Sequence, residues 1–550
     1  MKRNLFTSIF LILGLMCSAI AGVNLKNGNF YISYTDIVVP GGGEKLEITR
    51  TYNSKATEDG WFGFGWGSPF ETRLEVSADG SVVVHENGSG GKTRFIPKTP
   101  VDAEAASQKI VEAMRKKTSV TDDAAKKLVE RLNSNAELRH AYALNFGVSS
   151  NLAAGTVLFS NERGLQEVIK EKVGYLRKFN DGRKEYFDEK GHMVKIVDKN
   201  LYTVELVYKE DGSLETIKDS QAKQLFFSWY GDGKVKNIWS AGDKKTEYKF
   251  KGKDLIYSKD IAGNVYKYDY DTNHNLLAVD YSENANSKGR EKMIIDYEPK
   301  TFFVSKITDR NGDTTEYKYG SNPQKPDMHY WTEVIKKGFD GKPVSNRYEY
   351  EIKARADGSQ YTYRINTKIS GIETDTVYSE CCGLPLKIAR GKHITNFEYN
   401  DKGLLTKKTS SRGEFVKIDY DNTINKIAKV ENNEGWTKFS YDGKGNLQKA
   451  LNSTGQAVLL IYDRNGRISK MVDQDEKTKQ RRTLEFTYNA MGKPVEIAME
   501  KVGKINVEYD NYGEIKKVDS KSGHQMALQV TQAFQNLLTV VKPAGVNLNM

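Results

Sequence analysis

The sequence predicts a mainly β protein in which tandem hairpins form a curved, continuous β-strip or partial shell. Tyrosines recur at an interval of 21 residues, at Tyr399, Tyr420, Tyr441 and Tyr462 and again at Tyr488 and Tyr509. Apolar and polar residues alternate before each tyrosine, as expected for half-buried strands. A turn signal ending in glycine follows most of them. A fixed period of this length indicates a repeat architecture.

The phrase that each tyrosine opens predicts a turn between two strands. The clearest examples are Tyr399-Asn-Asp-Lys-Gly403, Tyr441-Asp442-Gly-Lys-Gly445, Tyr462-Asp463-Arg-Asn-Gly466, Tyr488-Asn-Ala-Met-Gly492 and Tyr509-Asp510-Asn-Tyr-Gly513. The Asp or Asn side chain can hydrogen-bond the backbone of its own turn, and glycine supplies the positive φ that the turn requires. Because one hairpin is not stable alone, we expect neighbouring repeats to pair into one continuous sheet.

These tandem phrases resemble the YD-repeat, or RHS, family. Three segments near the amino end are similar to the domain that precedes the repeats in bacterial RHS proteins: Gly28-Asn-Phe-Tyr-Ile-Ser-Tyr-Thr-Asp36, Ile48-Thr-Arg-Thr-Tyr-Asn-Ser54 and Gly60-Trp-Phe-Gly-Phe-Gly-Trp66. The resemblance implies a β-strip wound into a hollow shell, which in larger members encloses a carboxy-terminal toxin or lies at the cell surface. The sequence differs from toxin-bearing members of the family after Val518, where neither the autoproteolytic aspartate motif nor an effector follows.

Residues 1–21 have the features of a secretory signal peptide. A basic start precedes an apolar run from Leu5 to Met16, and Ala19-Ile-Ala21 is a small-residue cleavage site. We therefore expect export to the periplasm, the outer surface or the medium. No later segment is long enough to be a transmembrane helix in the mature chain.

Four regions are expected after the signal peptide. Residues 22–99 alternate as β-strands, residues 100–148 form a helical insertion, residues 149–519 form the repeat strip, and residues 520–550 form a helix and tail. In the insertion, Asp102 and Thr121 are expected helix caps, and Ser134-Asn-Ala-Glu137 has the spacing of a capping box.

An amphipathic helix is expected near the carboxy end. Apolar residues stand there at helical spacing: Val530, Ala533, Phe534, Leu537, Leu538 and Val541. We expect this helix to cap the open end of the sheet or to lie inside its curve, because an uncovered edge invites association. Docking of a partner on the helix is the alternative.

The charge of the chain does not indicate nucleic-acid binding. The net charge of +11 becomes 11 − 2 = +9 without Lys2 and Arg3, and the cations are spread over nearly every repeat. No basic helix or stacked aromatic motif is concentrated anywhere. Anionic envelope polymers and lipid head groups are alternatives as weak partners.

The sequence contains few patterns typical of catalytic sites, so we expect a protein that is not an enzyme and binds no cofactor. The seven histidines show no metal-ligand spacing, and no metal is expected. A calcium-type loop from Asp269 to Asp280 is a weak alternative, because His274 stands where that loop needs glycine. Cys381 and Cys382 are the only cysteines after the leader. A strained vicinal disulfide or two buried thiols are favoured over catalysis.

Trp61 and Trp66 are candidate ligand-stacking residues, because indole rings stack on sugar faces, although core packing is the preferred interpretation.

Taken together, the sequence predicts an exported, non-enzymatic scaffold that binds or wraps a protein or envelope polysaccharide. Two alternatives stay open: a partial cocoon or remnant of an RHS toxin-delivery system, and a carbohydrate-binding adhesin. The oligomeric state is not predicted.

Overall fold

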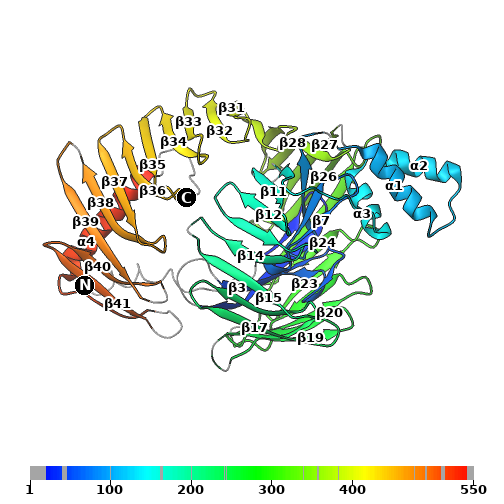
Figure 1. Ribbon diagram of the computed structural model, residues 1–550, viewed down its shortest axis with the longest axis horizontal. Coiled ribbons are helices and arrows are strands. Elements are labelled where there is room, and N and C mark those ends of the chain that lie inside the picture. The colour runs from blue at the N-terminus through cyan, green and yellow to red at the C-terminus, as the bar shows by residue number, and fades with distance from the viewer. Residues whose placement is uncertain are drawn as a thin grey trace.

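A curved strip of antiparallel strands dominates the molecule (Figure 1). The computed structural model describes residues 20–39, 46–99, 101–160, 165–199, 201–240, 242, 244–285, 287–338, 340–355, 358–381, 383–475, 477–489, 492–509 and 515–541. Within these ranges it contains 42 strands and four α-helices. The predicted fold class is confirmed: the protein is mainly β, with a helical insertion and a carboxy-terminal helix.

The strip comprises two sheets in which every strand pairs with its neighbours in sequence. The first has twelve strands: β7 (Arg73–Val76), β8 (Val82–Glu86), β9 (Gly91–Pro97), β10 (Val157–Ser160), β11 (Gln166–Lys170), β12 (Tyr175–Phe179), β13 (Lys184–Phe187), β14 (Met193–Val197), β15 (Thr203–Tyr208), β16 (Leu214–Asp219), β17 (Gln224–Trp229) and β18 (Val235–Trp239).

The second sheet has 24 strands and carries the regular repeats. They are β19 (Glu247–Lys251), β20 (Asp254–Lys259), β21 (Val265–Tyr270), β22 (Leu276–Asp280), β23 (Lys292–Tyr297), β24 (Val304–Thr308), β25 (Thr314–Ser321), β26 (His329–Lys337), β27 (Pro343–Ala354), β28 (Gln360–Ile369), β29 (Ile372–Tyr378), β30 (Pro385–Arg390), β31 (His393–Tyr399), β32 (Leu405–Ser410), β33 (Phe415–Asp421), β34 (Lys426–Asn432), β35 (Gly435–Tyr441), β36 (Leu447–Asn452), β37 (Gln456–Tyr462), β38 (Ile468–Asp475), β39 (Arg481–Tyr488), β40 (Pro494–Met499), β41 (Gly503–Tyr509) and β42 (Ile515–Asp519).

The prediction of one continuous sheet is wrong at a single junction. Between β18 and β19 the ladder is reduced to an isolated bridge, Trp239 with Lys245, and one flanking bond from Thr246 N to Ile238 O at 2.9 Å. The strip also begins earlier than residue 149, because β7, β8 and β9 already belong to the twelve-stranded sheet.

The helical insertion stands between two paired strands. Helices α1 (Ala103–Arg115), α2 (Asp122–Asn133) and α3 (Ala136–Phe146) connect β9 to β10, which pair at Phe159 and Ile96. Asp102 and Thr121 accept hydrogen bonds from Ala105 N and Ala124 N, as expected of caps. The third cap is corrected by one residue: Asn135 caps α3, since Ser134 ends α2 and its hydroxyl donates to Glu130 O.

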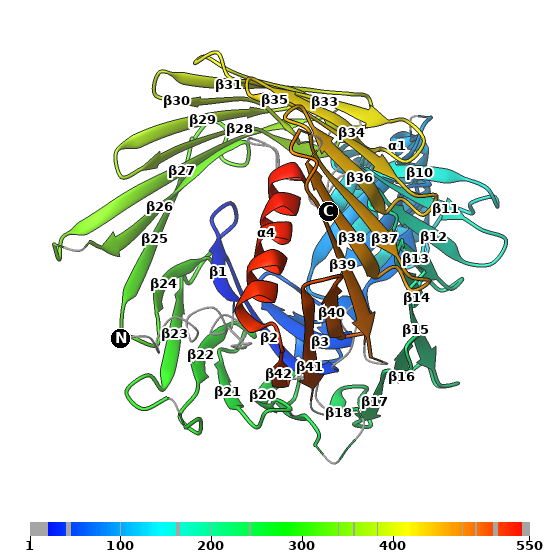
Figure 2. The ribbon, with the colours of Figure 1, turned by 90° about the vertical axis from the view of Figure 1, so that its left-hand side faces the viewer.

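A small amino-terminal sheet lies inside the curve of the strip (Figure 2). It comprises β1 (Ile20–Asn24), β2 (Asn29–Val39), β3 (Leu46–Asn53) and β6 (Trp66–Gly67), next to the short pair β4 (Asp59–Gly60) and β5 (Gly63–Phe64) and the 3₁₀ helix η1 (Pro69–Glu71). We call residues 20–67 the plug. Its apolar side chains and those of β7 to β24 form one hydrophobic core.

Helix α4 (Gly523–Val541) lies inside the other end of the curve (Figure 2). Met526, Ala533 and Val540 are fully buried against strands β33 to β39. The predicted helix is therefore present, but its buried stripe differs, because Phe534 and Leu538 are 38% and 50% exposed. Among the described residues, no helix is long and apolar enough to cross a membrane.

Candidate functional site

The repeat tyrosines tie each hairpin to the hairpin before it. Tyr462, at the end of β37, donates a 2.9 Å hydrogen bond to the carbonyl of Leu447, which begins β36. The equivalent bond, at 2.7 to 3.1 Å, is made by Tyr208, Tyr297, Tyr319, Tyr399, Tyr420, Tyr441, Tyr488 and Tyr509. We call this series the tyrosine ladder. It gives the repeat period a physical cause, since at these nine positions one hydroxyl bridges two successive hairpins.

The aspartate and glycine of each phrase build the turn. Asp442 Oδ1 accepts hydrogen bonds from Lys444 N and Asn446 N, and Gly445 N donates to Asp442 O. Gly445 has φ +81°, the left-handed region that favours glycine. Asp463 and Gly466 form the same turn, and Gly403 and Gly492 also have positive φ. Asp510 and Gly513 lie outside the described residues.

A buried ion pair joins the plug to the strip. Arg50 and Asp36 of the plug are paired at 2.6 Å with fully buried side chains. Arg50 also donates to Ser258 Oγ and Tyr268 OH of the strip, at 2.6 and 2.7 Å. Burial raises the pKa of Asp36, and Arg50 opposes that rise. Because Asp36 also accepts from Tyr248 OH of the strip at 2.8 Å, both charged groups are hydrogen-bonded across the junction between plug and strip.

Trp66 is a core residue, so its candidate role in ligand stacking is corrected. It is fully buried, Arg50 lies 4.6 Å over its ring, and its Nε1 donates to Tyr270 OH. Trp61 is only partly buried and lines a cavity of about 340 Å³ at the edge of the plug. Its ring packs edge to face on Trp229 at 5.6 Å.

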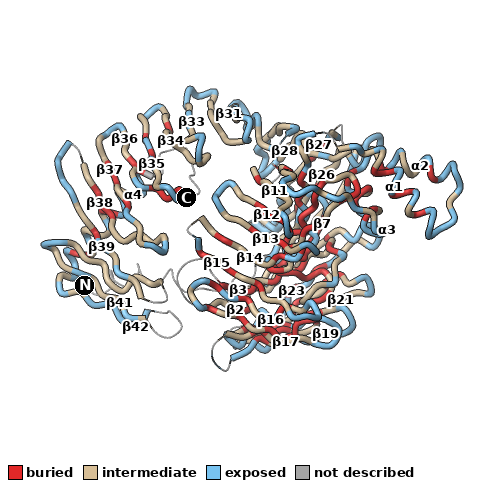
Figure 3. The backbone as a smooth tube through the Cα atoms, viewed as in Figure 1, coloured by how far each residue is buried: buried red, intermediate tan, exposed pale blue. Residues whose placement is uncertain are grey.

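The middle of the strip lies between the parts that the plug and α4 cover. They reach only its ends, where Lys26 Nζ of the plug donates to Thr362 Oγ1 of β28 and Leu405 of β32 packs against the α4 core. None of the residues of β28, β29, β30, β31 and β32 is buried on either face. Strands on both sides differ, since Tyr350 and Ile352 of β27 and Val416 and Ile418 of β33 are buried. Figure 3 shows this change in burial along the top of the curve. We call these five strands the open segment.

The inner face of the open segment can be traced through the strand register. Val416, which packs in the α4 core, pairs in series with Lys408 and Phe397. The next row on this face runs through Ile365, Thr376, Ile388 and Thr395. The inner face therefore combines apolar and hydroxyl side chains with the cations Lys408 and Arg390.

Cys381 is disulfide-bonded, in the turn between β29 and β30. Cys382, its expected partner, lies outside the described residues. In the segment considered as a calcium loop, Asp271 forms part of a repeat turn. Its Oδ1 accepts hydrogen bonds from Asn273 N and Asn275 N. His274, at φ +66°, takes the position that glycine occupies in other repeats.

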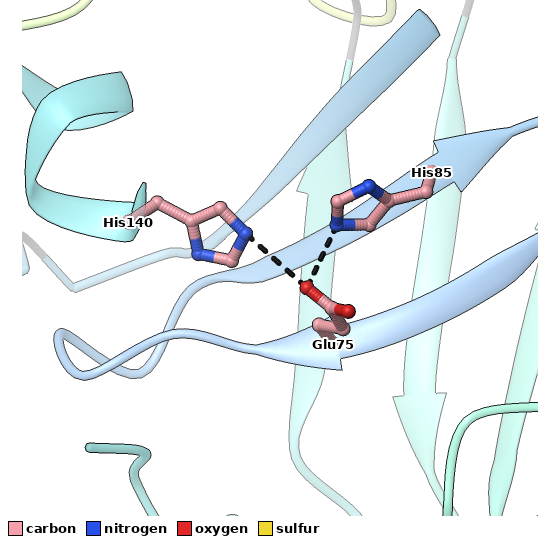
Figure 4. Close-up of side chains that lie close together, drawn as sticks. All are labelled: Glu75, His85 and His140. Atoms are coloured by element: carbon pink, nitrogen blue, oxygen red, sulfur yellow. Dashed lines mark hydrogen bonds and ion pairs between the residues drawn. The ribbon is translucent and has the colours of Figure 1, made fainter. Parts of the chain in front are cut away.

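Three side chains whose spacing in the sequence predicted no common site lie close together in the structure. Glu75, His85 and His140 offer ligand atoms that all lie within 4.8 Å of one another (Figure 4). They come from β7, β8 and α3, so no local motif could have revealed them. We expected no metal at the histidines because of their spacing along the chain. Such spacing cannot indicate ligands that come together from distant strands and helices.

Comparison with known proteins gives one family match. Residues 21–95 match the model described as Domain of unknown function (DUF6531). No curated protein matches the chain.

Two solved structures match most of this chain. The "TcdB2-TccC3-TEV" structure has 10% sequence identity and a TM-score of 0.39, and the match covers 90% of this chain and 30% of that one. A Tc holotoxin pore from Photorhabdus luminescens has 11% identity and a TM-score of 0.39, over 89% and 29%. This chain thus spans less than a third of the length of those chains.

Proposed function

We propose that this protein is an exported, non-enzymatic scaffold that holds a protein partner on the inner face of the open segment. The observation that carries the proposal is the run of five strands without a buried residue, set between two covered parts of one strip. A curved sheet with a half-exposed apolar inner face resembles the surfaces on which other proteins bind partners.

The chemistry of the surface supports a polypeptide. Ile388 and Phe397 offer apolar contacts, and Thr376 and Thr395 offer hydroxyls for hydrogen bonding. Arg390 and Lys408 stand on the same face, so apolar side chains accompanied by carboxylates would complement it. Trp66, one of the two candidate ligand-stacking residues, is buried, which weakens the adhesin alternative.

Export is part of the proposal and rests on the signal-like sequence of residues 1–21. Strand β1 begins at Ile20, so cleavage after Ala21 would leave Gly22 to Asn24 paired with β2. The plug core would stay intact, because its buried residues begin at Gly28.

Site-specific photo-crosslinking in the native cells tests the proposal. A photoreactive amino acid at Phe397 faces the inner side, and the same group at Asn396, its neighbour on β31, faces the outer side. We expect one defined protein to crosslink from position 397 and not from 396. Equal crosslinking from both positions, or none from 397, would overturn partner binding on this face.

A further inference from the structure

Three side chains from separate elements converge where the helical insertion meets the strip. Glu75 is on β7, His85 is on β8, and His140 is on α3 (Figure 4). His85 and His140 are 3% and 5% exposed. The cluster lies on the face of β7 and β8 opposite to Leu74 and Val84, which belong to the hydrophobic core around the plug. It is therefore distinct from the open segment.

The distances suit a single ion between the three groups. Glu75 Oε2 lies 2.8 Å from His85 Nε2 and 3.6 Å from His140 Nε2. Tetrahedral zinc, with bonds near 2.0 to 2.1 Å, places its ligand atoms about 3.3 Å apart. The two observed separations lie on either side of that value.

His140 lacks the hydrogen bonds that a buried imidazole normally makes. Both of its ring nitrogens are buried, and neither makes a hydrogen bond among the described residues, since Nε2 lies 3.6 Å from Glu75 Oε2, which is beyond hydrogen-bond distance. Leaving such atoms unsatisfied is costly, so a buried orphan group needs an explanation. A metal ion bound by Nε2 would satisfy the nitrogen that points toward Glu75.

The groups around the cluster have the arrangement of an outer coordination shell. Glu58 Oε1 lies 3.2 Å from His85 Nδ1, so His85 can donate there and keep Nε2 free as a ligand. Arg73 Nε donates to Glu75 Oε1 at 3.2 Å, which leaves Oε2 directed at the histidines. Carboxylates commonly orient metal-binding histidines in this way.

We propose that Glu75, His85 and His140 form a binding site for a divalent transition metal, with Zn²⁺ as the best-suited ion. Two imidazoles and one carboxylate are a zinc ligand set, and water completes the fourth position. Imidazole ligands disfavour Ca²⁺ and Mg²⁺, which take oxygen ligands.

The site would fasten the helical insertion to the strip. The neighbouring residue Arg139 already binds Asp79, in the turn between β7 and β8, at 3.0 Å. Asp79 also pairs with Arg94 of β9 at 2.8 Å. A metal at His140 adds a second attachment one residue further along α3. Metal binding would therefore stabilise the docking of α3, which links it to folding.

Metal binding by the purified mature chain tests the inference. After treatment with a chelator and dialysis, we expect titration with Zn²⁺ to give one tight site per chain. Co²⁺ in its place should give the visible absorption of a tetrahedral ion with nitrogen ligands. Removal of the metal should speed proteolysis at residues 116–121, between α1 and α2, without cutting the strip.

Matched variants separate this site from other histidine–carboxylate pairs. His140→Ala should abolish the tight site, and Glu58→Gln should weaken it by about 10- to 100-fold while keeping all three ligands. His329→Ala is the control, because His329 pairs with Glu349 at 2.7 Å, and among the described residues no third possible ligand lies close enough to complete a metal site with them. Absence of a tight site in the wild type would overturn the proposal. So would unchanged Zn²⁺ affinity in the His140→Ala chain.

Discussion

The hydroxyl of Tyr462 donates to the carbonyl oxygen of Leu447 across 2.9 Å, joining the hairpin of β37 and β38 to that of β35 and β36. Leu447 is itself the cross-strand partner of Tyr441, whose hydroxyl reaches back to Ile427. Each tyrosine therefore stabilises the hairpin before its own. This relationship explains why the period is counted from tyrosine to tyrosine.

Tyr462→Phe removes one rung of the ladder and leaves the Leu447 carbonyl without that donor. We expect a local loss of about 0.5 to 1.5 kcal/mol, the usual net worth of a hydrogen bond. Native-state hydrogen exchange should show faster exchange of amides in β36 and β37. Tyr257→Phe is the control, because no hydroxyl bond of Tyr257 occurs in the described part of the chain. Equal effects of the two changes would contradict the ladder.

Alkaline pH should weaken the repeats through the same tyrosines. Burial raises the pKa of Tyr399, Tyr420, Tyr441 and Tyr462 to about 12. An unfolded tyrosine ionises near pH 10, so above that pH the unfolded state holds fewer protons than the folded state. The stabilising contribution is complete below pH 10 and is lost as the pH rises toward 12.

A spectrophotometric titration checks this pH dependence. Tyrosinate absorbance should rise in two phases, and the later phase should coincide with loss of the β-sheet circular dichroism signal. A single phase near pH 10 with an intact sheet would show that the ladder hydroxyls are not held in the fold.

Gly191→Ala should be far more damaging than Gly212→Ala. Both glycines end repeat turns at φ +83° and +84°, so alanine is strained equally at both, by about 1 to 2 kcal/mol. A Cβ at Gly191 would lie 1.9 Å from Leu74 O, whereas a Cβ at Gly212 meets open space. Thermal unfolding of the two variants measures the difference. Similar melting temperatures would mean that β7 does not contact this turn.

Arg50→Met should loosen the plug by leaving Asp36 buried without its cation. Breaking a buried ion pair in this way costs about 3 to 5 kcal/mol. Adding Asp36→Leu should restore much of the loss, since an apolar pair replaces the charges. Arg364→Met, which breaks a pair with the partly exposed Asp375, should cost less than about 1 kcal/mol. Denaturant unfolding compares the three chains, and equal losses would contradict the anchoring role of Arg50.

Much of the strip could be predicted from the sequence because each repeat carries its own local signals. Alternation, a turn aspartate and a turn glycine determine a hairpin within about 21 residues, as at Tyr441 and Gly445. Two of the three helix caps of the insertion could also be predicted from neighbouring residues. At the third, Ser134 and Asn135 are both suitable cap residues, and only the end of α2 distinguishes them.

Long-range relationships could not be predicted in this way. Arg50 meets Tyr268 across 218 positions of sequence, and His85 meets His140 only because α3 folds back on β8. The exposed side of α4 shows the same limit. Phe534 and Leu538 match the helical period, yet they are exposed, and the curve of the strip buries Met526 and Val540 together with the expected Ala533.

Thiol labelling of the open segment in living cells tests the central claim most directly. Cysteine at Phe397 faces the inner side of β31, and cysteine at Asn396 faces the outer side. In the purified chain both should react readily with a maleimide, because neither position is buried. In cells, position 397 should be protected and position 396 should not. Equal labelling of both positions in cells would contradict a partner on the inner face.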